Sequence, residues 1–364
     1  MRCSERILIS EQQDNMNILI VKMSAIGDVI HTLPAVNALR AHFPDACITW
    51  LVEEAASEII ESHKAVDRVL ISKRKHWIKD PLGPPRLRSV KEILRFVGEL
   101  RDTAYDLVID FQGLMKSAVM VGFCRAERKI GYDRTREFSY LVLNERIPPY
   151  PMDRHAVLRY LNLVAHLGVD TRQIGFKIPF GEKEKSHVRT MLKQRGWDGE
   201  CVVAVNAMAK WKTKLWDAES FTRLANMLVE ALGCFVVFTG STADEKEIGK
   251  ITFNTRAECT SFSGQTNLRD LAALFEMAKC VVSIDTGPMH LAAAVGTPVV
   301  ALFGPTDPWR TGPFGKGHQV IRADVSCSPC FKKRCESVVC MKDISVEQVF
   351  DSVIKIPMDS RPDS

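Results

Sequence analysis

The sequence has 364 residues, of which 46% are hydrophobic and 26% charged, and its formal net charge is +5. This balance is typical of globular proteins and excludes a disordered chain, while the length predicts two domains of ordinary size. The basic excess is too small and too local for a nucleic-acid-binding protein, whose cationic residues usually form a dense cluster.

The start of the chain predicts neither export nor membrane insertion. Residues 1–15 are polar and lack the apolar core of a secretory signal, so we interpret 1–16 as an N-terminal extension or the product of a start codon upstream of Met16. The most apolar stretch, 280–304, is interrupted by Asp285 and His290, which argues against a spanning helix. Eleven cysteines without an export signal predict reduced thiols in the cytoplasm.

Strands alternate with helices from residue 17 onward. In the first half we predict strands at 17–22, 47–52, 67–71 and 107–110 and helices at 28–42 and 90–101. After a proline-rich break and a helix near 155–167, we predict strands at 201–206, 235–239, 281–284 and 298–303 and helices at 218–232, 268–278 and 288–295. This alternation predicts parallel, doubly wound α/β sheets, in Rossmann-like domains over 17–180 and 181–364 that face each other across a cleft.

The most informative stretch is 283–305, SIDTGPMHLAAAVGTPVVALFGP. Asp285 and Thr286 follow a strand, Gly287 permits a tight turn, and the proline after it suits the first turn of a helix. Either Asp285 or Thr286 is a candidate cap for that helix. A helix N-terminus offers N–H donors and a positive dipole end to a diphosphate, and His290 adds a donor. An ordinary capped helix with a packed histidine is the alternative.

Two further segments follow strand ends. The segment 206–216 carries Lys214 between aromatic residues, and a lysine beside a helix N-terminus can neutralise a leaving diphosphate. In 24–35, SAIGDVIHTLPA, Asp28 begins a helix and can act as a general base, although an acidic residue is also favoured there by the helix dipole. His31 lies on the same helical face, where it either orients Asp28, contacts an acceptor or simply packs.

Basic residues cluster in two other places, at 73–75 and at 86–91. Such patches suit a phosphorylated or carboxylated substrate or an anionic membrane, and Lys75 is our acceptor-site candidate there. A solvated surface is the alternative.

Four cysteines near the end of the chain have the spacing C-x₂-C-x₄-C-x₄-C: Cys327, Cys330, Cys335 and Cys340. The spacing is compatible with a structural metal site or a redox-sensitive group, but reduced thiols without a metal are our prediction.

Several of these motifs together resemble glycosyltransferase family 9, the ADP-heptose:lipopolysaccharide heptosyltransferases. The resemblance rests on SAIGDVIHTLPA, DLVIDFQGLMKSA at 106–118, TKLW at 213–216 and SIDTGPMHLAAAVGTPVVALFGPTDP at 283–308, and it runs from about 17 to 355. The VEEAASEI, KRKHW and GYDRTRE segments resemble the heptosyltransferase I subgroup, which adds the first heptose to the Kdo region of lipid A. The heptosyltransferase II subgroup, or a member with another donor or acceptor, is the alternative.

The resemblance implies a GT-B fold and an inverting, metal-independent transfer without a cofactor, at the cytoplasmic face of the inner membrane. The donor, ADP-L-glycero-D-manno-heptose, would bind the second domain, and a Kdo-lipid A acceptor would bring the enzyme to the membrane surface. Asp28 matches the family's proposed base. The donor positions are Lys214, Asp244, Asp285, Thr286, Gly287 and His290. Lys22 and Arg136 match basic positions linked to phosphate or acceptor binding, beside our own acceptor candidates His31 and Lys75.

Some residues differ from the family pattern. Asp244 stands where glutamate is familiar, so its reach toward a ribose is shorter. Met208 and Ala209 replace hydroxyl residues near the diphosphate. A nucleotide-sugar-binding scaffold without transfer activity is a competing function, but it would not need both Asp28 and Lys214. An epimerase of similar architecture would not predict the SAIGD and DTGPMH motifs together.

Overall fold

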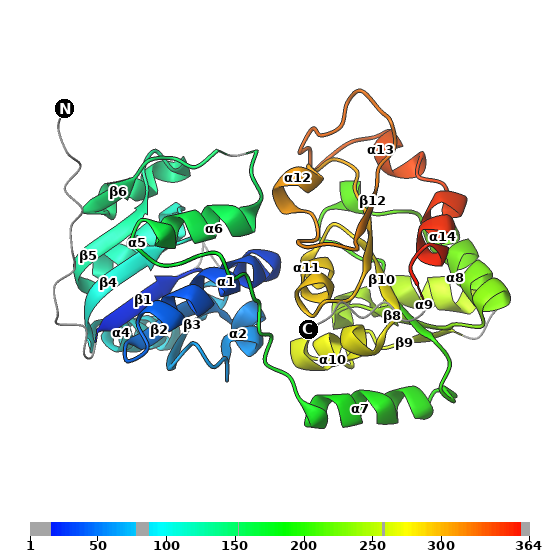
Figure 1. Cartoon of the computed structure of the whole chain (residues 1–364), viewed down its shortest axis with the longest axis horizontal. Coiled ribbons are helices and arrows are strands. Elements are labelled where there is room, and N and C mark those ends of the chain that lie inside the picture. Colours follow the sequence, from blue (N-terminus) through cyan, green and yellow to red (C-terminus); the bar gives the residue numbers. More distant parts are fainter. Residues whose placement is uncertain (1–15, 78–86, 152, 257–258, 358–364) are drawn as a thin grey trace. The chain divides into compact units, whose positions relative to one another are not determined.

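The computed structural model describes residues 16–77, 87–151, 153–256 and 259–357. The chain divides into two compact units (Figure 1). Unit 1 comprises the described residues of Met1–Ser24, Thr32–Tyr150 and Tyr160–Ile174. Unit 2 comprises those of Ala25–His31, Pro151–Arg159 and Gly175–Ser364. The division therefore runs through two helices, α1 (Ile26–His42) and α6 (Ala156–Ala165).

Unit 1 contains a parallel six-stranded sheet in the order β3-β2-β1-β4-β5-β6. Its strands are β1 (Asn17–Val21), β2 (Cys47–Glu53), β3 (Arg68–Ser72), β4 (Ala104–Asp110), β5 (Arg125–Tyr132) and β6 (Glu145–Ile147). The central strands are continuous apolar runs because both faces of a parallel sheet are covered by helices, and the side chains of Ile18–Val21 are completely buried. Because these strands are parallel, the carboxyl ends of β1, β2 and β4 lie at one edge of this sheet, and the buried polar residues Lys22, Glu53 and Asp110 lie at those ends.

The remaining helices of unit 1 connect these strands. They are α2 (Glu54–Ile60), α3 (Arg74–Trp77), α4 (Leu87–Arg101), α5 (Met115–Phe123) and the 3₁₀ segment η1 (Arg136–Val142). Within η1 the backbone kinks, since Glu137 and Phe138 have φ values of 60° and 56°. Helix α4 is amphipathic but keeps apolar side chains at its surface, among them Ile93 and Leu94.

Unit 2 has a second parallel six-stranded sheet, in the order β12-β11-β10-β7-β8-β9. Its strands are β7 (Val202–Asn206), β8 (Phe235–Thr239), β9 (Cys259–Ser261), β10 (Cys280–Ile284), β11 (Val299–Leu302) and β12 (Gln319–Ile321). The strand order reverses at β7 and β10, the kind of switch point at which ligands bind in open α/β sheets.

The helices of unit 2 begin and end with recognisable signals. They are α7 (Glu182–Lys193), η2 (Lys212–Lys214), α8 (Ala218–Leu232), η3 (Thr242–Asp244), α9 (Glu245–Asn254), α10 (Leu268–Met277), α11 (Gly287–Ala294), α12 (Pro308–Thr311), α13 (Val339–Lys342) and α14 (Val346–Ile354). Asp217 caps α8 by accepting a bond from the Ser220 amide at 2.7 Å, and Gly233 ends it with φ of 60°. Asn267 and Ser345 cap α10 and α14 in the same manner.

The doubly wound parallel architecture predicted from the alternation of elements is confirmed, and most predicted elements differ by only a few residues at their ends. Four strands were not predicted: β5, β6, β9 and β12. β6, β9 and β12 have only three residues each and lie at sheet edges, where a short run leaves little periodic signal. β5 lies inside the sheet, but its sequence, RAERKIGY, contains four charged residues and lacks the apolar run by which buried strands were predicted. Among the helices of the described ranges, none combines the length and apolar character needed to span a bilayer.

Candidate active site

A buried ion pair lies at the carboxyl end of β10. Asp285 follows the strand and is 6% exposed. Its Oδ2 accepts hydrogen bonds from Lys214 Nζ at 2.5 Å and from Thr306 Oγ1 at 2.6 Å, while Lys214 Nζ also donates to the Asp285 carbonyl at 3.2 Å. A buried carboxylate is stable only when its charge is matched in this way. The three residues therefore fix an ammonium group at the sheet edge.

Aromatic packing holds the same lysine from another side. Lys214 closes η2, and its Nζ lies 4.8 Å from the centre of the Trp211 ring. Lys333 Nζ lies 5.1 Å from the same ring, so a second cation shares this aromatic face. A cation over an indole ring is stabilised electrostatically. The lysine and tryptophan pattern of 206–216 is thus a real local structure, whereas no sequence signal pointed to Lys333.

Helix α11 begins immediately after the ion pair. Thr286 is its N-cap residue in an extended conformation, and, within the described part of the chain, its side chain makes no capping bond. The Asp285 carboxylate is engaged by Lys214 and Thr306, so neither residue provides the predicted side-chain cap. Without such a cap, the first N–H groups of the helix are suited to an anionic ligand. Gly287 has little room, since a Cβ there would lie 3.1 Å from Ile26 Cβ.

His290 is buried in the first turns of α11. Its Nδ1 lies 3.0 Å from His31 Nε2, so the two rings share one hydrogen. Burial lowers the pKa of His290 to about 4, although the charges of Asp285 and Asp28 oppose this shift. The imidazole is therefore neutral at pH 7. It contributes hydrogen-bonding atoms to the site but no positive charge.

The segment Ala25–His31 belongs to unit 2 together with the β10 turn. Asp28 is half-buried in the first turn of α1, where its Oδ2 accepts a bond from the Ala25 amide at 3.3 Å and its charge complements the helix dipole. A Cβ on Gly27 would lie 2.2 Å from His290 Cδ2, so only glycine fits. Unit 2 thus includes the base candidate and all six donor candidates. Its predicted site residues are Asp28, His31, Lys214, Asp244, Asp285, Thr286, Gly287 and His290.

Asp244 has a local structural function. It follows β8 and its Oδ2 accepts bonds from the Ser241 amide at 2.8 Å and the Ser241 hydroxyl at 2.6 Å. These bonds organise the turn that leads into α9. A ribose contact by this carboxylate stays a prediction.

The remaining acceptor candidates are in unit 1 and differ in exposure. Lys22 is buried at the end of β1, where its Nζ donates to the Tyr160 hydroxyl at 2.6 Å and to the Phe111 carbonyl at 3.2 Å. These contacts give Lys22 a structural role, and its link to phosphate stays a prediction. Lys75 is 62% exposed, and Arg136 is exposed at the start of η1.

Sequence reasoning missed a charged cluster in unit 1. Glu53, at the end of β2, forms ion pairs with Arg74 at 3.5 Å, Lys75 at 3.0 Å and Lys116 at 3.1 Å. Its side chain is 4% exposed; burial raises its pKa, but the hydrogen bonds and charges of Lys75 and Lys116 outweigh burial and lower it. VEEAASEI and DFQGLMKSA were noted as motifs, but spacing alone does not pair residues 63 positions apart.

Gln112 was also missed. Its Oε1 accepts bonds from the amides of Met23 at 3.0 Å and Ser24 at 3.1 Å, and it thereby shapes the turn that precedes Asp28. The carboxylate of Asp110 in turn accepts from the amides of Gln112 and Gly113. The DFQG segment therefore supports the SAIGD turn, which explains why the two motifs occur together.

The cysteine cluster contains free thiols: Cys327, Cys330, Cys335 and Cys340. Across the ranges that the structure describes, no three or more histidine, cysteine or acidic side chains are arranged to hold a metal ion. Cys340 is buried in the core of unit 2, and the other three lie at or near the surface. Burial and the other three thiols raise the pKa of Cys340, so the four cysteines lie close enough to interact, and reduced thiols without a metal stay a prediction.

Comparisons with known proteins agree with the motifs. The family model for glycosyltransferase family 9 (heptosyltransferase) matches residues 93–339. Lipopolysaccharide heptosyltransferase 1 of Pseudomonas aeruginosa is 32% identical over 322 residues, 88% of this chain and 87% of the relative. The structure of E. coli heptosyltransferase WaaC with ADP has a TM-score of 0.77 and 28% identity, covering 94% of this chain and all of that one. WaaC with ADP-2-deoxy-2-fluoro heptose has a TM-score of 0.73 and 29% identity, covering 93% and 99%.

These likenesses extend over both units and confirm the predicted GT-B fold, with its two doubly wound domains. The family model covers the charged cluster of unit 1 in part and the complete β10 turn. The sequence match to a heptosyltransferase 1 includes nearly nine-tenths of the chain. This chain is a glycosyltransferase and belongs to glycosyltransferase family 9, the heptosyltransferases.

Proposed function

We propose that this chain transfers L-glycero-D-manno-heptose from ADP-heptose to the Kdo region of a lipid A-type acceptor in lipopolysaccharide inner-core synthesis. The similarity to heptosyltransferase 1 supports the reaction, and the ADP and ADP-heptose-analogue complexes of a similar enzyme support the donor. The observation that carries the proposal is the fixed Lys214 ammonium beside the N-terminus of α11.

The proposed donor site uses two kinds of positive potential. The first amides of α11 and its dipole would bind the diphosphate, and Lys214 would meet the charge that grows on the leaving ADP. The ion pair with Asp285 and the ring of Trp211 hold the lysine before the donor arrives, so little reorganisation is needed. Preorganised charge of this kind is usually the largest contribution to catalysis.

Asp28 is the proposed general base. Its carboxylate would take the proton of the acceptor hydroxyl while that oxygen attacks the anomeric carbon and the bond to ADP breaks on the opposite face. This path inverts the anomeric configuration. The neutral imidazole of His290, which is hydrogen-bonded to His31, offers a hydrogen-bonding group beside the base without competing for the proton at pH 7.

The acceptor would be a lipid, so we also propose that the enzyme works peripherally at the cytoplasmic face of the inner membrane. The exposed ammonium of Lys75 and the guanidinium of Arg136 suit an anionic headgroup or acceptor phosphate. This part of the proposal rests on the chemistry of the acceptor and on surface charge.

Incubation of the purified chain with ADP-heptose and a Kdo-bearing lipid A acceptor tests the function, with product mass as the readout. We expect a single added heptose and release of ADP. An acceptor that already carries the first heptose serves as the comparison substrate. Preferential addition to that substrate would contradict the proposed acceptor and indicate heptosyltransferase II activity.

A further inference from the structure

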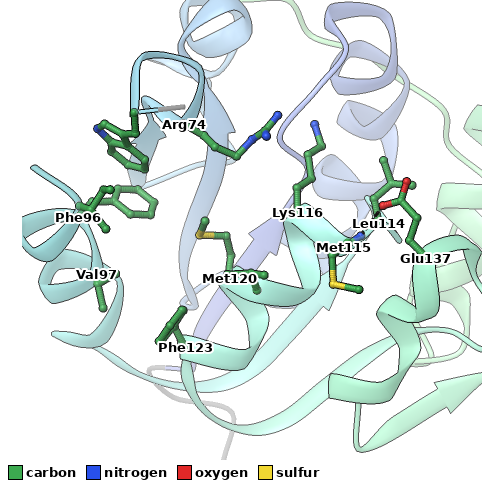
Figure 2. Close-up of a pocket in the computed structure, with 12 residues that line it drawn as sticks. Arg74, Phe96, Val97, Leu114, Met115, Lys116, Met120, Phe123 and Glu137 are labelled. Atoms are coloured by element: carbon green, nitrogen blue, oxygen red, sulfur yellow. Dashed lines mark hydrogen bonds between the residues drawn. The ribbon is translucent and has the colours of Figure 1, made fainter. Parts of the chain in front are cut away.

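Unit 1 contains an apolar groove between side chains of α4 and α5. Its volume is about 630 Å³, within the range of small-molecule sites. Side chains from α4 and α5 line it, among them Phe96 and Phe123 (Figure 2), and Trp77 at the end of α3 also belongs to the lining. The apolar lining used below consists of Trp77, Ile93, Phe96, Val97, Val119 and Phe123. We refer to this cavity as the α4–α5 groove.

Several of these side chains are exposed to solvent. The exposed fractions are 37% for Ile93, 44% for Val119 and 46% for Phe123. Scattered apolar residues are ordinary on a protein surface, but a contiguous set lining a concave site marks a place where an apolar ligand binds. Phe96 is buried at the base of the groove and tilts against Trp77, with ring centres 5.2 Å apart. The groove therefore has a rigid aromatic floor.

One end of the groove is cationic. Figure 2 shows the charged ends of Arg74 and Lys116 on the same side of the lining residues. Together with Lys75 they surround the single carboxylate of Glu53, which leaves positive charge unmatched within this group. Glu137 also lines the groove, but its carboxylate accepts a bond from the Met115 amide.

The cationic end is linked to the turn that leads to Asp28. Lys116 Nζ donates to the hydroxyl of Ser24, four residues before the proposed base. The Trp77 indole, in the same short helix as Arg74, donates to Glu92 at 3.3 Å. A ligand that fits must therefore have an anionic head near the SAIGD turn and an apolar tail directed along α4 and α5.

We infer that the α4–α5 groove holds one fatty acyl chain of the anionic glycolipid acceptor, with an acceptor phosphate or carboxylate at Arg74 and Lys116. This inference rests on the proposed function, because it extends the acceptor from its sugar to its lipid. A concave groove suits a single chain better than the surface of a bilayer, which would contact protruding residues. Leu94, 66% exposed on the same helix, protrudes and is not among the residues that line the groove.

Ile93 and Leu94 form a matched pair for kinetics. With fully acylated acceptor, we expect Ile93→Glu to raise KM about tenfold, because a charge would enter the apolar groove, and to leave kcat unchanged. With acceptor whose acyl chains have been removed chemically, Ile93→Glu should behave as wild type. Leu94→Glu should behave as wild type on both. Equal losses for the two variants would overturn the inference in favour of a bilayer contact.

Val119→Trp is the second variant, since it fills the groove without introducing charge. It should raise KM for the acylated acceptor only. Should neither groove variant distinguish the two acceptors, the groove does not bind an acyl chain.

A binding measurement separates this inference from the transfer reaction. Lysophosphatidic acid with a brominated acyl chain, used as a monomer below its micellar concentration, should quench the fluorescence of Trp77. The difference between wild type and Trp77→Phe isolates that tryptophan from the other five in the sequence. Quenching that Ile93→Glu abolishes and Leu94→Glu retains supports the groove even if no heptose transfer is found. Quenching that is absent in the wild type, or the same in both glutamate variants, would overturn it.

Discussion

Two strand-to-helix turns of this molecule place an aspartate near a helix start, but the two carboxylates differ in burial and in their hydrogen-bond partners. Asp285, after β10, is buried and bound by Lys214 and Thr306. Asp28, in the first turn of α1, is half-buried and accepts a 3.3 Å bond from a backbone amide. Similar local sequence thus yields one carboxylate committed to an ion pair and another that is suited to exchange a proton.

This difference assigns the two residues separate tasks. A carboxylate that anchors a lysine stabilises charge, and removing its partner leaves an uncompensated buried ion. A carboxylate in the first turn of a helix interacts favourably with the helix dipole, an interaction typically worth about 0.3–1 kcal/mol. The comparison predicts that changes at Asp28 affect the reaction, while changes around Asp285 affect both the fold and donor binding.

The largest expected effect is that of Asp28→Ala on turnover. Loss of a general base should lower kcat by about 10²- to 10⁴-fold, since nothing else takes the proton from the acceptor hydroxyl. ADP affinity and the melting temperature should stay near those of wild type. Calorimetric ADP titration and steady-state kinetics on the same preparation provide the measurement. Turnover at the wild-type rate would remove Asp28 from the mechanism.

Lys214→Met should cost about 3–5 kcal/mol of unfolding free energy, because it leaves the Asp285 carboxylate buried without its cation. Chemical denaturation measures this change. The matched control is Lys214→Met combined with Asp285→Asn, which removes both charges and should recover most of the stability but not the donor affinity. Equal stability of the single and double variants would show that the pair is not coupled.

His290 is buried, and the resulting decrease of its pKa should make stability depend on pH. Its pKa in the folded state, about 4, is below the usual 6.5, so the unfolded state binds more protons between these values. The unfolding free energy should therefore fall by about 3 kcal/mol as the pH drops from 6.5 to 4. Above pH 6.5, His290 should cause no change of the unfolding free energy with pH. His290→Asn should flatten the profile between pH 6.5 and 4. If the unfolding free energies of wild type and His290→Asn change with pH in parallel, the lowered pKa of His290 is contradicted.

The smallest effect concerns Thr306, the second donor to Asp285. Thr306→Val keeps the shape but removes a hydroxyl bond to a buried charge, so the unfolding free energy should drop by about 2 kcal/mol. Thr297→Val, a buried hydroxyl bonded to a neutral carbonyl, is the comparison and should cost about 1 kcal/mol. Similar losses at both positions would mean that the charge of Asp285 is screened.

The sequence predicted the strands that carry the site because they are buried on both faces. β8 and α8 have the predicted bounds, since a continuous apolar run, a capping aspartate and a terminal glycine mark their ends. The position of Asp285 at a strand end followed from the same pattern. The family resemblance added the roles of individual residues, which periodicity cannot supply.

Partners distant in sequence could not be predicted. The pairing of Lys214 with Asp285 joins residues 71 positions apart, and Thr306 reaches the same carboxylate from the loop after β11. Spacing also gave no sign that Lys22 is buried rather than presented to a ligand. Such contacts depend on which strands are neighbours, and strand order is a property of the whole sheet.

The bond between Lys22 and Tyr160 has a consequence for synthesis on the ribosome. The ammonium sits at the end of β1, near the start of the chain, but the hydroxyl that accepts its hydrogen bond is 138 residues further along. A nascent chain that has produced all six strands of unit 1 still lacks this acceptor. Completion of that unit must therefore wait until α6 has left the exit tunnel, so the first half of the protein matures only after translation of the second has begun.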